Sequence, residues 1–179
     1  MNRDMHLSLI GFMGSGKSTV GQAMATRLGR PFLDIDAEVE RMLGMPIPQV
    51  FAELGEPAFR EAEQDALSDA LRPNEPIVLA TGGGTPCAEG AMEWMRRKSL
   101  VVALAPPLEV LLLRLESSLD TRPMLQGKTG QALAQHVQRM MLTRAACYGQ
   151  ADVTWTHGEW TDALLDDALA QVRWRLEGS

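Results

Sequence analysis

Short, mostly apolar runs alternate with longer amphipathic segments along this chain. Runs that lack strict polar alternation are typical of strands buried on both faces of a sheet. We therefore predict strands at 7–10, 31–36, 76–80, 99–105 and 152–156. The segments between them predict helices, several of which end at a glycine that can act as a C-cap. These helices are expected at 17–28, 37–43, 47–54, 59–71, 91–97, 108–115, 131–147 and 161–176.

Strands that alternate with helices are typical of parallel βαβ units, so the expected fold is a three-layer α/β/α arrangement. In such folds, ligands bind at the carboxyl ends of the strands. Gly11, the Asp34/Asp36 pair and the run Gly82–Gly84 all follow predicted strands. We therefore expect these three clusters to meet at one edge of the sheet, where they would form a functional site.

The first cluster is a glycine-rich turn between a strand and a helix. Residues 11–18 read GFMGSGKS and fit the phosphate-loop pattern GxxxxGK[ST]. In that motif, backbone N–H groups and the helix N-terminus surround phosphate oxygens, the lysine reaches the β- and γ-phosphates, and the serine hydroxyl ligates Mg²⁺. The predicted nucleotide-binding residues here are Gly14, Ser15, Gly16, Lys17, Ser18 and Thr19.

The second cluster is a pair of carboxylates, Asp34 and Asp36. Two residues apart on a strand, they would share one face. One could approach the water shell of the metal, and the other could accept hydrogen bonds or a proton from an acceptor hydroxyl. The alternative is helix capping by Asp36, which precedes the predicted helix at 37–43.

Three arginines and the glycine run complete the candidate chemistry. Guanidinium groups suit bidentate contact with carboxylate or phosphate, although each arginine alone is more often a surface charge. Arg60 and Arg144 are candidates for such a contact, and Arg122 lies in the polar segment 116–130, which we predict to be a mobile lid. Arg122 could reach the transferring phosphoryl group as an arginine finger. The run Gly82–Gly84 is either a flexible turn or a close approach of backbone amides to a ligand.

Composition and charge narrow the choice of partners. The 179 residues suffice for one domain, and a net charge of −6 argues against general binding to nucleic acid or a membrane surface. We find no apolar run of membrane-spanning length in the sequence. The two cysteines, Cys87 and Cys147, are far apart and form no CxxC motif, so we expect neither a disulfide framework nor a zinc site. The expected compartment is the cytoplasm.

Nearly the whole chain resembles the shikimate kinase family. The resemblance rests on segments that occur in the family's order and spacing: GFMGSGKSTVG, FLDIDAEVE, IPQVFAELGEPAFREAE, ATGGGT, TRPML and RAACY. It implies a nucleoside monophosphate kinase type of fold, with a five-stranded parallel sheet in the order 2-3-1-4-5. It also implies transfer of the γ-phosphate of ATP to the 3-hydroxyl of shikimate, in aromatic amino-acid biosynthesis, by an enzyme that uses Mg²⁺ and that we expect to be monomeric.

The resemblance also assigns roles to residues. It places Arg60 and Arg144 on the shikimate carboxylate and Arg122 on the phosphates. It places Asp34 near the water shell of Mg²⁺ and Arg114 near adenine. The remaining implied shikimate-site residues are Asp36 and Gly82, Gly83 and Gly84, with Phe51 and Phe59 as apolar walls; core packing is an equally good explanation of these two aromatic residues.

The residues thus predict direct, in-line phosphoryl transfer, with Lys17, Asp36 and Arg122 as the catalytic group. The rival enzyme class is gluconate kinase, whose substrate is also a polyhydroxylated carboxylate. A rival of another kind is a nucleotide-binding module without catalysis. The combination of Lys17, Ser18, Asp34, Asp36 and Arg122 argues against such a module, which has no need of all five.

Overall fold

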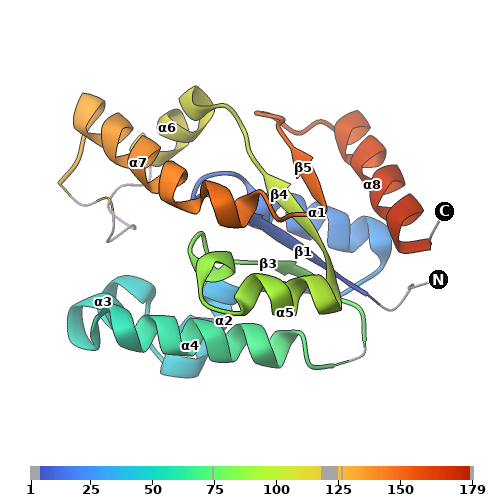
Figure 1. Ribbon diagram of the computed structural model, residues 1–179, viewed down its shortest axis with the longest axis horizontal. Coiled ribbons are helices and arrows are strands. Elements are labelled where there is room, and N and C mark those ends of the chain that lie inside the picture. The colour runs from blue at the N-terminus through green and yellow to red at the C-terminus, as the bar shows by residue number, and fades with distance from the viewer. Residues whose placement is uncertain (1–4, 74, 118–124, 126, 178–179) are drawn as a thin grey trace.

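A computed structural model describes residues 5–73, 75–117, 125 and 127–177. Its centre is a five-stranded sheet in the order β2-β3-β1-β4-β5, in which every neighbouring pair is parallel. Helices cover both faces of this sheet (Figure 1). The predicted three-layer fold and the strand order 2-3-1-4-5 are therefore confirmed.

Strands and helices follow each other as the apolar pattern predicts, with small shifts at their ends. The strands are β1 (His6–Gly11), β2 (Phe32–Asp34), β3 (Val78–Ala80), β4 (Ser99–Leu104) and β5 (Val153–Trp155). The helices are α1 (Lys17–Leu28), α2 (Ile35–Leu43), α3 (Ile47–Glu53), α4 (Gly55–Ala70), α5 (Ala91–Lys98), α6 (Leu108–Glu116), α7 (Gly130–Tyr148) and α8 (Asp162–Glu177), with a 3₁₀ turn, η1 (Thr85–Cys87).

Alternate residues of the central strands enter two separate hydrophobic cores. Leu7 and Leu9 of β1 pack with α1 and α8 on one face, whereas Ile10 packs with α2, α4 and α5 on the other. All six residues of β1 and of β4 are buried, as expected for parallel strands with helices on both faces. A third cluster, which includes Phe12 and Leu115, lies between α6 and α7. The sheet is therefore a rigid support for the loops at its carboxyl edge.

Helices α2 and α4 begin two and four residues earlier than the sequence predicts. Asp34 ends β2 and caps α2, where its side chain accepts a 3.0 Å hydrogen bond from the backbone N–H of Asp36. Asp34, and not Asp36, is therefore the cap, and the two carboxylates do not share a strand face. Helix α4 begins at Gly55 because Pro57 lies in its first turn, where a backbone N–H has no helical partner to lose.

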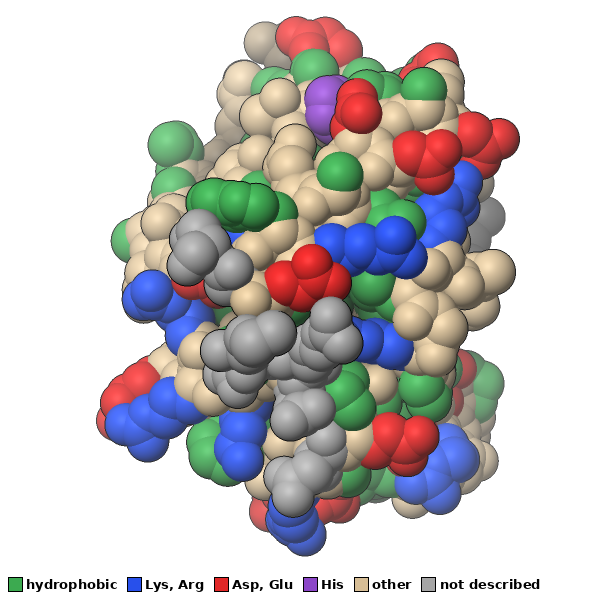
Figure 2. Space-filling model, turned by 90° about the vertical axis from the view of Figure 1, so that its right-hand side faces the viewer, with side chains coloured by type: hydrophobic (Ala, Val, Ile, Leu, Met, Phe, Trp, Pro, Cys, Tyr) green, Lys and Arg blue, Asp and Glu red, His purple; other side chains and the backbone are tan. Residues whose placement is uncertain are grey.

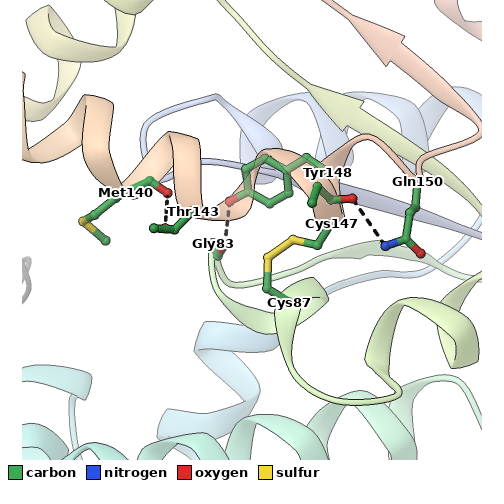
Figure 3. Close-up of a disulfide and its surroundings, with 8 residues drawn as sticks. Gly83, Cys87, Met140, Thr143, Cys147, Tyr148 and Gln150 are labelled. Atoms are coloured by element: carbon green, nitrogen blue, oxygen red, sulfur yellow. Dashed lines mark hydrogen bonds between the residues drawn. A yellow bond between two sulfur atoms is a disulfide. The ribbon is translucent and has the colours of Figure 1, made fainter.

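The sequence analysis expected no disulfide framework, and the structure contradicts this expectation at one pair of cysteines. Cys87 and Cys147 form a disulfide across 60 residues of sequence, with their Cα atoms 5.5 Å apart (Figure 3). That separation lies within the usual range for a disulfide. The two cysteines are far apart in the sequence but close in space. The parallel sheet brings η1, which follows β3, against the last turn of α7.

The edge of the molecule that carries both chain termini lies opposite the strands' carboxyl ends. Figure 2 shows that face, on which acidic and basic side chains are interspersed. In the described part of the chain, no helix is both long enough and apolar enough to span a bilayer.

Candidate active site

The phosphate loop wraps around the N-terminus of α1. Gly11, Gly14 and Gly16 all have positive φ, a conformation that glycine adopts without the steric cost of a Cβ. Lys17 is nearly buried, and its ammonium group donates 3.0 Å hydrogen bonds to the carbonyls of Gly11 and Phe12. The loop therefore concentrates positive charge and helix N–H groups at one point, the arrangement that binds phosphate.

A hydroxyl and a carboxylate meet beside this loop. The Ser18 hydroxyl donates a 2.5 Å hydrogen bond to Asp34, whose carboxylate is held by its capping role at α2. Mg²⁺ in kinases is usually bound by one or two such oxygens together with phosphates and waters, rather than by a cage of protein ligands. This pair fits that donor set, and the described residues contain no cluster of three or more metal-ligating side chains.

The loop opens into a cavity of about 480 Å³, which Asp34 and Asp36 also line. Arg114 lies on its wall, where one guanidinium nitrogen donates a 3.0 Å hydrogen bond to the Gly14 carbonyl and another donates to that of Gly158. Trp160 lies on the same wall and packs edge-on against Trp155, 5.3 Å between ring centroids. Arg114 therefore links the phosphate loop to the segment 158–160, which carries the aromatic ring of Trp160.

A second cavity, of about 360 Å³, lies beside the first. Helices α2, α3 and α4 form one side of it, and the loop after β3 together with α7 forms the other. It is lined by Met13, Asp36, Glu40, Pro46, Ile47, Pro48, Phe51, Phe59, Arg60, Glu63, Gly82, Gly83, Gly84 and Arg144. Every residue that the resemblance assigns to shikimate therefore lies on one cavity, Phe51 and Phe59 included.

Arg60 is held on the cavity wall by two carboxylates of its own helix. Its guanidinium pairs with Glu63 at 2.9 Å and with Glu56 at 3.0 Å. Burial works to lower the pKa of Arg60, but the hydrogen bonds to Glu63 and Glu56 raise it overall. Glu63 is buried and accepts a further 2.6 Å hydrogen bond from Thr85. This network links α4 to the turn η1.

The glycine run allows these side chains to approach the backbone closely. A Cβ at Gly82 would collide with the carboxylate of Glu63 and lie 3.0 Å from that of Asp36. A Cβ at Gly84 would lie 2.7 Å from the guanidinium of Arg60. The sequence left open whether this run is a flexible turn or a place where another group approaches the backbone closely. The structure favours close approach, and the approaching groups in it are protein side chains.

Arg144 has an unusual environment for a charged residue. It is buried, its guanidinium lies over the ring of Phe12 at 5.3 Å, and its Nη1 atom has no hydrogen-bond partner among the described residues. Nη1 is also close to Gly83, since a Cβ placed there would lie 3.2 Å away. A buried cationic nitrogen without a partner is costly unless a ligand completes it. Arg144 therefore places a cationic side chain with an unsatisfied nitrogen at the second cavity.

The two cavities share a border. Met13, Asp36 and Gly83 line both of them. A group that enters from the phosphate loop and a group that enters from the Arg144 side would meet beside the carboxylate of Asp36. This adjacency is what a direct transfer between two bound substrates requires.

The structure brings together most of the predicted site, and it adds residues that the sequence did not single out. Arg122 lies outside the described residues, as do 118–124 and 126 of the predicted lid. The sequence analysis missed Glu63, Trp160 and Met13. An acidic residue three positions after Arg60 on the same helix is a signal that could have identified Glu63. Met13 could have been identified because it lies within the phosphate-loop motif, whereas Trp160 carries no local signal.

The parallel sheet, the phosphate loop and the adjoining acceptor cavity define a P-loop kinase that acts on a small acceptor molecule. The family model described as shikimate kinase matches residues 13–172. This chain belongs to the shikimate kinase family, whose members are ATP-dependent kinases.

Individual relatives agree with the family match. A shikimate kinase of Nitrobacter winogradskyi is 40% identical over 174 residues, covering 95% of this chain and 78% of that protein. The crystal structure of shikimate kinase from Bacteroides thetaiotaomicron superposes with a TM-score of 0.86 at 32% identity, covering 97% of this chain and 99% of the other. That of shikimate kinase from Acinetobacter baumannii, in complex with shikimate, gives 0.80 at 33% identity and covers 94% and 90%.

The rival enzyme class shares the fold. A gluconokinase from Sinorhizobium meliloti superposes with a TM-score of 0.58 at 17% identity, covering 99% of this chain and 96% of that one. At that identity the likeness concerns the fold alone.

Proposed function

We propose that this protein transfers the γ-phosphoryl group of ATP to the 3-hydroxyl of shikimate, giving shikimate 3-phosphate and ADP for aromatic amino-acid biosynthesis. The observation that carries the proposal concerns Arg144, which lies on the wall of a cavity that borders a phosphate loop. Its buried Nη1 has no hydrogen-bond partner within the described part of the chain. A guanidinium nitrogen of this kind can donate a charge-assisted hydrogen bond to a small anion beside the nucleotide. The carboxylate of shikimate is such an anion.

The carboxylate of the acceptor would bind between Arg144 and Arg60. Arg144 contributes the nitrogen that lacks a partner, whereas Arg60 would exchange its exposed partner Glu56 for the substrate and keep the buried Glu63. The hydroxyls of the ring would then point toward the border with the phosphate loop. There Asp36 can accept their hydrogen bonds and take the proton of the attacking 3-hydroxyl.

The phosphoryl transfer would depend on positioning and charge neutralisation. Lys17 would leave the carbonyls of Gly11 and Phe12 for the phosphate oxygens, and the helix N-terminus of α1 would hold the rest of the phosphate chain. Ser18 and, through water, Asp34 would hold Mg²⁺, which neutralises the phosphate charge when it is bound. We also propose that Arg122 contacts the phosphates and that the lid at 116–130 excludes water.

The base of ATP would lie at the far end of the nucleotide cavity. Once the phosphates are at Lys17, Arg114 and Trp160 are wall residues available to the base. Indole and guanidinium faces both stack on purines. Trp160 therefore acquires a role that its sequence context did not suggest.

Replacing Trp160 tests this placement. We expect Trp160→Ala to raise KM for ATP about tenfold through loss of base stacking, with KM for shikimate little changed. Binding of ADP should also quench tryptophan fluorescence in the wild type, and Trp160→Phe should abolish the quench while keeping the affinity. Trp174→Ala is the matched control, because Trp174 is an exposed residue of α8 outside this cavity. A quench that survives Trp160→Phe would contradict the placement.

Replacing Arg60 tests the carboxylate site. We expect Arg60→Ala to raise KM for shikimate about tenfold, because one of two cationic contacts is lost, and to leave KM for ATP nearly unchanged. The melting temperature should also fall, since the buried Glu63 loses its ion pair. Arg72→Ala, which removes an exposed guanidinium just after α4, is the control in both measurements. Unchanged shikimate kinetics in Arg60→Ala would remove this residue from the site.

The function itself is tested by coupled ADP release from purified protein with ATP and Mg²⁺. Shikimate, gluconate and no acceptor are compared at equal concentration. Release that requires shikimate is the expected result. Release with gluconate alone would reject the assignment of the arginines, and bound ATP without acceptor-dependent release would favour the non-catalytic module.

Location and assembly follow from the same proposal. Both cavities lie within one chain, so a monomer would suffice for activity. We infer a cytoplasmic location because ATP is available there as a substrate.

A further inference from the structure

The disulfide joins the two elements that bear the acceptor site. Cys87 is the last residue of η1, three positions after Gly84 of the glycine run. Cys147 lies in the last turn of α7, three positions after Arg144. Figure 3 shows the bond crossing from the turn to the helix. A covalent tie therefore lies about one helical turn from the proposed carboxylate contact.

A hydrogen bond also connects the turn after β3 to α7. The phenol of Tyr148 donates a 2.5 Å hydrogen bond to the carbonyl of Gly83, which itself lines the cavity (Figure 3). Burial raises the pKa of Tyr148, so the phenol stays protonated and able to donate throughout the neutral range. If the disulfide were cleaved, the turn and α7 would keep this hydrogen bond and side-chain packing, which are non-covalent contacts that can open.

The position of the bond suits a reversible modification more than a structural staple. Structural disulfides are typical of small domains that lack a sufficient core, whereas this chain has three hydrophobic clusters. Cys87 is exposed and Cys147 is half-buried, so a thiol or a disulfide in solution can reach the pair from the Cys87 side. Exposed disulfides are the labile ones in thiol–disulfide exchange.

We propose that Cys87 and Cys147 form a redox-modification site that takes a small disulfide, such as glutathione disulfide, and sets the affinity for the acceptor. The inference rests on the proposed role of Arg144 in binding shikimate. The disulfide-bonded form keeps Arg144 and Gly83 in a fixed position relative to each other, so the acceptor site is pre-organised. The dithiol form leaves α7 and the turn free to separate, and part of the binding free energy is then used to order them.

The chemistry is an ordinary exchange and it balances. The Cys87 thiolate attacks one sulfur of glutathione disulfide, which breaks that S–S bond and releases one glutathione thiolate. The Cys147 thiolate then attacks the Cys87 sulfur of the mixed disulfide, forms the internal bond and releases the second glutathione thiolate. Two protein thiols are oxidised, one glutathione disulfide is reduced to two thiols, and the two protons lost by the protein are taken up by the released thiolates.

The test compares the two redox forms of the whole protein. Samples equilibrated with glutathione disulfide or with dithiothreitol are freed of reagent, and their thiols are titrated to establish zero and two per chain. KM for shikimate, KM for ATP and kcat are then measured for each form. We expect the oxidised form to have a KM for shikimate about five times lower, with KM for ATP and kcat changed less than twofold.

Cys87→Ser and Cys147→Ser are the control variants. Each should keep the high KM of the dithiol form under both treatments. An equal KM for shikimate in the two wild-type forms would overturn the proposal, as would a redox effect that persists in Cys87→Ser or an equal shift of KM for ATP. Because kcat at saturating shikimate is measured in the same samples, an absence of shikimate-dependent activity would instead reject the proposed function.

Discussion

Replacing Lys17 with methionine is expected to lower kcat about 10³-fold in the shikimate-dependent assay. The ammonium of Lys17 lies at the mouth of the phosphate loop, nearly buried and beside the N-terminus of α1. In a site that excludes water, removal of a pre-organised charge that stabilises the transferring phosphoryl group costs more than it would at the surface. Methionine keeps an unbranched side chain that is one atom shorter, so the main loss is the charged ammonium group.

The control separates this effect from misfolding. Lys98→Met removes a lysine at the end of α5, next to the start of β4 and thus at the opposite edge of the sheet. It should leave kcat within twofold. Circular dichroism and the melting temperature of Lys17→Met should stay close to the wild type. A Lys17→Met protein with more than a tenth of the wild-type kcat would contradict the proposed role of the phosphate loop.

Replacing Arg144 with methionine is expected to reduce kcat/KM for shikimate by about 10² to 10³, chiefly through KM. The variant removes a charge-assisted contact to the carboxylate, and contacts of that kind, when desolvated, account for a large share of binding. The free energy of unfolding should increase or stay unchanged. Nη1 of Arg144 is buried without a partner in the described residues, so an apolar replacement removes a desolvation penalty from the folded state.

This opposition between activity and stability distinguishes a binding residue from a structural one. The melting temperature of Arg144→Met should equal or exceed that of the wild type, while the enzyme needs far more shikimate to reach half its maximal rate. Arg139→Met, an exposed change on the same helix, serves as the matched control for both readouts. If Arg144→Met unfolds at a clearly lower temperature and its KM is unchanged, Arg144 supports the fold and does not bind the acceptor.

The sequence predicted the parts of the molecule that depend on local pattern. Buried parallel strands appear as apolar runs, and the phosphate loop has its glycines, lysine and serine within eight positions. Both were therefore predictable. Asp34 and Asp36 were predicted to be a functional pair on one strand face. The shared strand face was wrong, because a cap and a strand end look alike in sequence.

What could not be predicted depends on contacts between distant segments. Trp160 reaches the nucleotide cavity through Arg114, whose guanidinium bridges Gly14 and Gly158. Cys87 and Cys147 meet because α7 returns to the turn after β3. The hydrophobic periodicity of the sequence does not predict either contact, because each depends on how whole helices and strands pack on the sheet.

The border formed by Met13, Asp36 and Gly83 has a consequence for inhibitor design. Because these three residues line both cavities, a single molecule could occupy both if its linker crossed there. An adenosine polyphosphate joined to a cyclohexene carboxylate would bind its second half intramolecularly, at a high effective concentration. A linker placed elsewhere would have to leave the protein surface and return. The shared border therefore fixes both the attachment point and the shortest useful length of such a bisubstrate compound.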